Sequence, residues 1–249
     1  MITIESTPNH AGVTIKGDFS DFHQLYDALH EVVGDEEEYP SHYEARLRVL
    51  ALCYDLRHAF MGDRGVAFVS NGLDDETKRW HGIVAPDKNV YLTFNVLWPE
   101  LLFYTMALND FARLHARKLS KSGYNYFEDK NVIWDASLAQ IRLFQAAVFE
   151  CIQQTVPSTV LGRLKNMMFG YSVSFERYTT QYLDVLNIRF LELDRDKRVK
   201  NISIMVKRLV EKGDEYQEYR VAVNQAAKTH NCSPDDIQLN VDYPEEIDW

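Results

Sequence analysis

Two histidines and an aspartate near the N-terminus have a spacing that suits metal binding. His23, Asp27 and His30 are four and three residues apart, so on a helix they fall within about 60° of one face. Two imidazoles and a carboxylate can bind a divalent metal and leave positions open for a substrate. The alternative is a solvated polar face beside an apolar stripe. We favour that alternative, because a catalytic metal normally takes ligands from more than one element.

A second candidate set lies in the predicted helix at 42–61. Asp55 precedes His58 by three residues, which would let the carboxylate orient the imidazole as a general base. Glu44 and Arg48 share this face, so the competing interpretation is an ion-paired helix surface, worth about 0.2–0.5 kcal/mol per pair. We favour the ion-paired surface here as well.

A third candidate set lies where an apolar segment becomes charged. Asp110, Arg113 and Arg117 fall within roughly 60° of one another on a helix. Arginine suits carboxylates and phosphates, so this stripe could form a ligand or anion pocket. The alternative is an internal ion network, because buried charged residues are normally paired. The network is the interpretation we favour, although this stripe opens off a buried helix and is the best place to look for a site.

The cysteines indicate a protein with reduced thiols, and the sequence contains none of the common catalytic motifs. Cys53, Cys151 and Cys232 are far apart, odd in number and outside any CxxC pair, which is the usage of a cytosolic protein. No Walker A loop, GxGxxG, GxSxG, HExxH or zinc-finger spacing occurs in the chain. The motifs therefore indicate no cofactor, and a non-enzymatic protein is favoured over an enzyme.

The charge balance argues against nucleic acids and anionic membranes as partners. The 249 residues carry 27 Lys and Arg against 37 Asp and Glu, a formal net charge of −10, whereas such partners require a basic surface. Basic clusters within 113–121 and 195–208 are expected to pair with nearby acids. The final stretch from Asp235 contains six acidic residues and no basic one. An acidic protein of this kind suits another protein as its partner.

The segment from Val90 to Leu108, VYLTFNVLWPELLFYTMAL, contains one charged residue, Glu100. Its first half alternates as a strand, and its second half predicts a helix at about 98–119 with Pro99 in the first turn, where a missing N–H is tolerated. A helix that is apolar all round is a core helix. Pro99 and Glu100 interrupt the run too early for a membrane span, which needs roughly 20 apolar residues.

The remaining periodicities predict a small antiparallel sheet and several helices. Ile2–Glu5 and Val13–Lys16 alternate as strands and form a hairpin with a long loop. Short strands are expected at 66–69 and 89–96. Further helices are expected at 19–33, 42–61, 131–155, 158–169, 174–192, 195–212 and 214–230, with a short one after Ser233.

These elements predict an α+β fold, mainly α, with a helical core around the central buried helix at about 98–119 and a small N-terminal antiparallel sheet. One compact domain over residues 1–249 is the simplest organisation. The alternative is a subdivision near 157, between a mixed part at 1–157 and a helical part with an acidic tail at 158–249. No targeting segment is recognised at the N-terminus, so a cytoplasmic location is expected.

Seven short segments spread along the chain support a resemblance to a known family. They are TPN at 7–9, AGVTI at 11–15, CYDLRH at 53–58, LWPELLF at 97–103, MALNDF at 106–111, YLDVLN at 182–187 and YPEE at 243–246. Together they resemble an uncharacterised bacterial family, a domain of unknown function. The resemblance extends over the whole chain, which favours a single domain, and it implies no activity or site residues.

Two functions follow as hypotheses. The favoured one is a non-catalytic, acidic, cytosolic bacterial protein that binds another protein, such as an immunity-type inhibitor or a defence-system component. The alternative is a small-molecule-binding protein or a metal- or anion-dependent enzyme, with its site near Asp110 and Arg113 or near His23, Asp27 and His30. The oligomeric state is left open.

Overall fold

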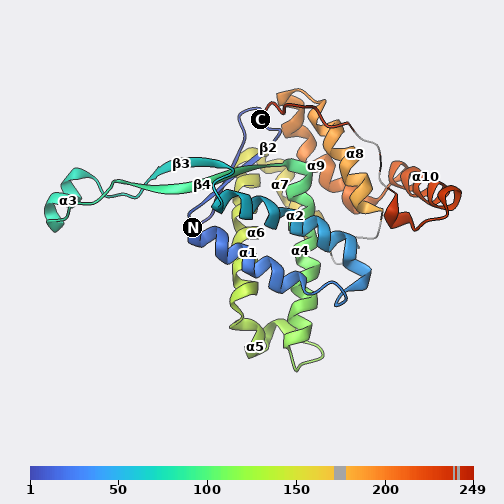
Figure 1. The fold of residues 1–249 in the computed structure, drawn as a ribbon, viewed down its shortest axis with the longest axis horizontal. Coiled ribbons are helices and arrows are strands. Elements are labelled where there is room, and N and C mark those ends of the chain that lie inside the picture. Colours follow the sequence, from blue (N-terminus) through green and yellow to red (C-terminus); the bar gives the residue numbers. More distant parts are fainter. Residues whose placement is uncertain (171–177, 238, 240–241) are drawn as a thin grey trace.

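One central helix organises the protein. In the computed structural model, which describes residues 1–170, 178–237, 239 and 242–249, α4 (Trp98–Leu119) runs through the middle of the body (Figure 1). Every residue from Trp98 to Leu108 is buried. The predicted fold, mainly helical with a small antiparallel sheet and a central buried helix, is confirmed.

Helices from both halves of the chain pack on α4. Residues on either side of 157 therefore share one hydrophobic core, which extends from Ile2 to Tyr216. The helices packed on α4 are α1 (Phe19–Val33), α2 (Tyr43–Phe60), α6 (Ala136–Thr155), α7 (Ser158–Phe169), α8 (Thr179–Leu191) and α9 (Arg195–Glu211). Helix α10 (Asp214–His230) stands at the far side of the body (Figure 1).

Helix α1 begins and ends where its sequence predicts. The Asp18 side chain accepts a hydrogen bond from the Asp21 N–H, and the Asp21 side chain accepts one from the Asp18 N–H. This reciprocal pair is a capping box, which satisfies two main-chain donors at the helix start. Gly34 follows the last turn with φ of 70°, a conformation that favours glycine.

The four strands form one antiparallel sheet in the order β1-β2-β4-β3. Strands β1 (Thr3–Ser6) and β2 (Gly12–Gly17) form the predicted hairpin, and β4 (Lys88–Leu97) joins β2 to β3 (Gly65–Ser70). In this register Ile4, Ile15 and Phe94 share one face. That face is buried against the helices, and Phe94 lies edge-on to Phe22 of α1 at 5.4 Å between ring centroids.

Two helix predictions need correction. The helix predicted at 131–155 is two helices, α5 (Lys130–Ile133) and α6, because the Asp135 side chain accepts from the Leu138 N–H and starts a new helix. A helix that was not predicted, α3 (Asp75–His81), is capped in the same way by Asp74. The first residues of the helix predicted at 174–192 lie outside the described residues, and the short tail helix is the 3-10 turn Pro234–Asp236.

A long hairpin projects away from the helical body. Strand β3, helix α3 and the outer half of β4 form it, and we call residues 64–91 the arm (Figure 1). Its residues are exposed or half-buried, and none is fully buried. The arm is the main departure from the compact domain that the sequence predicts. Among the described helices, none is long and apolar enough to cross a membrane.

A pair of glycine substitutions tests the sheet packing. A Cβ at Gly12 would overlap the main-chain carbonyl of Val96 in β4, whereas a Cβ at Gly162 in α7 would meet open space. Gly12→Ala should therefore lower the free energy of unfolding by about 1–3 kcal/mol. Gly162→Ala should raise it by about 0.5–1 kcal/mol, because alanine favours helix. Urea unfolding followed by circular dichroism measures both, and a Gly12→Ala protein as stable as wild type would contradict the close approach.

Candidate functional site

The buried carboxylate of Glu100 lies at the centre of a polar cluster between three helices. Arg48 of α2 donates to both carboxylate oxygens, with its Nε 3.0 Å from Oε2. The same guanidinium donates from Nη2 to Oδ1 of Asp184 in α8 at 2.7 Å. A charged group buried away from water is stable only when it is paired and hydrogen-bonded. We call Arg48, Glu100, Asp184, Asn187 and Tyr243 the polar centre.

Two further residues complete the polar centre. Asn187 of α8 donates from Nδ2 to Glu100 Oε1 at 2.6 Å, and the same nitrogen lies 3.0 Å from the Tyr243 hydroxyl oxygen. Tyr243 donates its hydroxyl proton to Asp184 Oδ1 at 3.1 Å. Through Tyr243 the C-terminal segment is attached to the helical body.

Burial and charge shift the proton affinities in this region. Burial alone would lower the pKa of the Arg48 guanidinium, but Glu100 and then Asp184 raise it above its ordinary value. Burial, followed by the charge of Glu100, raises the pKa of Tyr104 well above its usual range. Burial also raises the pKa of Tyr243 to about 12, with contributions from Asp184 and Glu100. The guanidinium therefore stays charged and both phenols stay neutral at physiological pH.

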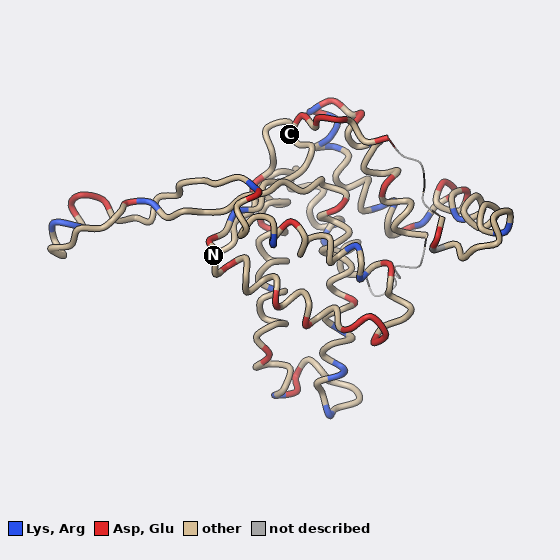
Figure 2. Tube along the Cα trace, viewed as in Figure 1, with Lys and Arg blue, Asp and Glu red and all other residues tan. Residues whose placement is uncertain are grey.

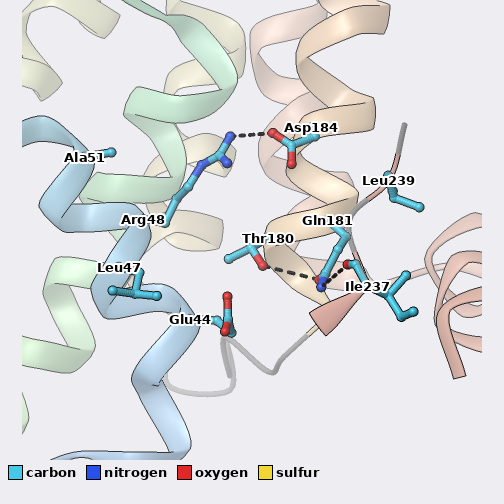
Figure 3. A pocket seen from close by; sticks show the side chains of 9 residues that line it. All are labelled: Glu44, Leu47, Arg48, Ala51, Thr180, Gln181, Asp184, Ile237 and Leu239. Carbon is cyan, nitrogen blue, oxygen red and sulfur yellow. Dashed lines mark hydrogen bonds and ion pairs between the residues drawn. The ribbon is translucent and has the colours of Figure 1, made fainter. Parts of the chain in front are cut away.

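A pocket opens beside the polar centre. It has a volume of about 420 Å³ and lies between α2, α8 and the chain at Ile237 and Leu239. In Figure 3 the Arg48–Asp184 ion pair lies at one end, and Gln181 reaches the carbonyl of Ile237 (3.4 Å) at the other. The Arg48 guanidinium already binds two carboxylates here. The arrangement therefore suits an anchor between elements more than a receptor for an anion.

The acid–base pair expected at Asp55 and His58 is not formed by those two residues. Asp55 accepts a hydrogen bond from Nη2 of Arg64 at 2.8 Å. His58 Nδ1 lies 3.0 Å from Asp63 Oδ2, and its ring lies tilted against that of Tyr54, with 4.2 Å between centroids. Both contacts lie near the base of the arm.

The expected metal ligands on α1 are exposed. His23 Nδ1 lies 3.0 Å from Asp27 Oδ2, and both of these side chains are more than half exposed. The exposed His30 ring lies tilted against that of Tyr26, with 4.6 Å between centroids. Burial, and then the charge of Arg46, lowers the pKa of His30. Within the described residues, no group of three or more His, Cys, Asp or Glu side chains is placed to hold a metal ion.

The expected anion stripe on α4 is divided. Asp110 and Arg113 form an ion pair in which both side chains are largely buried, and burial raises the pKa of Asp110. His42 faces this carboxylate, and burial lowers the pKa of its imidazole. Arg117 instead lies over the ring of Tyr126, 5.2 Å from its centroid. Two of the three predicted residues are thus in contact, and the third has a different partner.

The thiols offer little chemistry in the core. Burial raises the pKa of Cys53 to about 12 and that of Cys151 to about 11. A thiol at such a pKa is almost entirely protonated near neutral pH and is a poor nucleophile. Cys232 is exposed.

The arm carries the second candidate site, an apolar surface without a cover. Val66 pairs with Leu92 and Phe68 pairs with Val90, so these four residues share the face that holds Phe94 in the body. Phe94 is 4% exposed, whereas Phe68 is 68% exposed. Of these four residues, only Leu92 still packs against the hydrophobic core. Beyond Leu92, toward the tip of the arm, no helix of the body among the described residues covers this face of the sheet.

The end of the arm is ordered by local hydrogen bonds. We call residues 71–87 the tip. Asn71 donates from its main chain to the carbonyl of Asp87 and from its side chain to that of Pro86, both at 3.0 Å. Gly82 ends α3 in the left-handed conformation. On this ordered tip Trp80 is 85% exposed, and Ile83 and Val84 are exposed as well.

Sequence reasoning identified neither site as such. Glu100 is the one charge in an apolar segment, and a lone charge in a core helix implies a buried partner. That partner, Arg48, is 52 positions away, and Asp184 is a further 84 positions beyond Glu100. The YLDVLN and YPEE segments contain Asp184, Asn187 and Tyr243. The sequence motifs therefore include three residues of the polar centre, but they do not show that these residues meet.

A family model matches nearly the whole chain. The family described as Domain of unknown function (DUF6904) matches residues 2–249. Neither a curated protein nor a solved structure matches the chain.

Removing the cation tests the polar centre as a structural anchor. Arg48→Met leaves Glu100 and Asp184 without their shared partner, and breaking a largely buried ion pair from one side should lower the free energy of unfolding by about 3 kcal/mol. The control is Lys207→Met, which removes a cation from an exposed pair with Glu211 at 3.6 Å and should change stability by less than about 1 kcal/mol. Equal effects in urea unfolding would contradict the anchor role.

The Tyr243 hydroxyl should make stability fall at alkaline pH. Its pKa in the folded protein is about 12 and about 10 in an unfolded chain, so the unfolded state loses its proton first. The contribution of the Tyr243 hydroxyl to the free energy of unfolding is therefore complete below pH ~10 and is lost as the pH rises toward ~12. Tyr243→Phe should be less stable than wild type at pH 8, and the difference should shrink as the pH rises above ~10. Urea unfolding at pH 8 to 11 measures this, and parallel curves for the two proteins would contradict it.

Proposed function

The chain belongs to the DUF6904 family, whose function is unknown, and we propose that it is a protein-binding module that holds its partner through the arm. The body, built around α4 and the polar centre, serves as the rigid support. The observation that carries the proposal is the apolar face of the arm, which continues the core face of the sheet beyond its helical cover.

The chemistry of the arm supports a protein partner. Large exposed apolar patches mark interaction surfaces, and aromatic residues are enriched in the buried centres of protein interfaces. Phe68 on the strand and Trp80 at the tip are both more than two-thirds exposed. A two-stranded hairpin alone is at best marginally stable in water, so a partner that covers this surface would also stabilise the arm.

The distribution of charge also supports an apolar interface on the arm. The arm contains four basic and four acidic residues, so its formal charge is zero, and the net charge of −10 belongs to the rest of the chain. Figure 2 shows both strands of the arm free of charge over most of their length. Apolar contact therefore dominates the proposed interface, with charges at its ends. An immunity-type or defence-system role, the class expected from the sequence, would be one use of such a surface.

Substitution of Trp80 tests the proposal. A tagged wild-type protein purified from its native cells should retain a partner, and Trp80→Glu should weaken that complex about 10-fold or more in Kd, because truncated interface tryptophans commonly remove more than ~1.4 kcal/mol. Mass spectrometry identifies the partner, and titration calorimetry with the purified partner measures the Kd.

The matched control is Trp134→Glu at the end of α5, which lies away from the arm (Figure 1); this tryptophan is 83% exposed, against 85% for Trp80. It should leave the Kd unchanged. A partner that binds Trp80→Glu as tightly as wild type, or that is lost equally from both variants, would show that the arm is not the binding surface.

A further inference from the structure

The two edges of the sheet differ in how they are protected. Strand β1 is four residues long, contains Glu5 and contacts α6. Strand β3 pairs with β4 on one side only, and among the described residues nothing pairs with its other side. Proteins normally protect an edge strand by making it short, by charges or proline, or by covering it. Strand β3 has none of these features, since residues 65–73, GVAFVSNGL, contain no charge and no proline.

The sequence of β3 is compatible with pairing to itself. Two copies of an edge strand pair in antiparallel fashion about a twofold axis normal to the sheet, and even-numbered positions then face even-numbered ones. With Ala67 at the axis, Val66 faces Phe68 of the other copy, and no charge faces a like charge. The apolar face defined by Val66, Phe68 and Val90 would continue across the axis as one surface.

The charge distribution selects the occupant. A partner strand that carries charges would form no ion pair with residues 65–73, which are uncharged. Such a strand would also lose the hydration of its own charges upon pairing. Two bodies with a net charge of −10 repel each other when they meet directly. The neutral arm projects away from the body (Figures 1 and 2), so pairing there brings two copies together without apposing their acidic surfaces.

We infer that β3 is a dimerisation edge, on which the β3 strand of a second copy pairs antiparallel to give one continuous eight-stranded sheet. The inference uses the main-chain edge of β3, whereas the proposed function uses the apolar face of the arm and the tip, so both faces of the arm and Trp80 stay available in the dimer. Each arm would then be stabilised by the other along its strands.

Light scattering after size exclusion tests the dimer. The wild-type protein should have the mass of a dimer at micromolar concentrations, and Phe68→Lys should shift it to a monomer by placing like charges near the axis. The control is Asn89→Lys, on the exposed opposite face of the arm and in β4, which does not form the proposed interface; it should remain dimeric. Circular dichroism should show equal helix content in all three proteins.

Cross-linking tests the register. In a Cys232→Ser background, which removes the exposed thiol, Ala67→Cys should form an intermolecular disulfide upon treatment with diamide, because directly opposite Cβ atoms lie about 4.5–5.5 Å apart. Asn89→Cys should not. A wild-type monomer at all concentrations tested, or a dimer unaffected by Phe68→Lys and not cross-linked through Ala67→Cys, would overturn the inference. A monomer that still loses its partner upon Trp80→Glu would leave the proposed function standing alone.

Discussion

The constraint on which the rest of the body depends is the burial of one carboxylate inside an otherwise apolar helix. Glu100 lies in the first turn of α4 and is about nine-tenths buried. Its charge must therefore be balanced from other elements, and Arg48 from α2, with Asp184 and Asn187 from α8, supplies the necessary partners. A cation shared between two carboxylates fixes the relative positions of three helices more narrowly than apolar packing, because hydrogen bonds are directional.

The arm follows from a different constraint. The alternation of residues that buries Phe94 and Ile15 beneath helices continues outward along β4 and β3. The helices end before the strands do, so the same pattern produces a core in one place and an exposed apolar surface in the other. Only two of the four strands extend beyond the body, which leaves the arm with an uncovered apolar face and with strand edges that have no partner among the described residues.

The first proposal uses the apolar face and the tip of the arm, and the second uses the main-chain edge of β3. The tip presents Trp80, Ile83 and Val84 on a short helix with local caps, whereas the edge of β3 presents main-chain groups and an uncharged sequence. A dimer formed through the edges would display two tips, and two linked binding sites increase the apparent affinity for a multivalent partner. The acidic body would keep neighbouring molecules from associating in other ways.

The sequence alone determined the features that depend on neighbours along the chain. The bounds of α1, the first hairpin and the central position of α4 follow from caps, alternation and apolar periodicity, and α3 was missed because its cap at Asp74 lies among turn residues. Tertiary structure alone decided which charged side chains are in contact. Asp55 pairs with Arg64 rather than with His58. Arg117 lies over the ring of Tyr126, whereas Asp110 and Arg113 pair with each other. Tertiary structure also decided that residues 64–91 project from the body. The physical reason is that a periodic pattern specifies which residues share a face, but what covers that face depends on contacts between residues far apart in the chain.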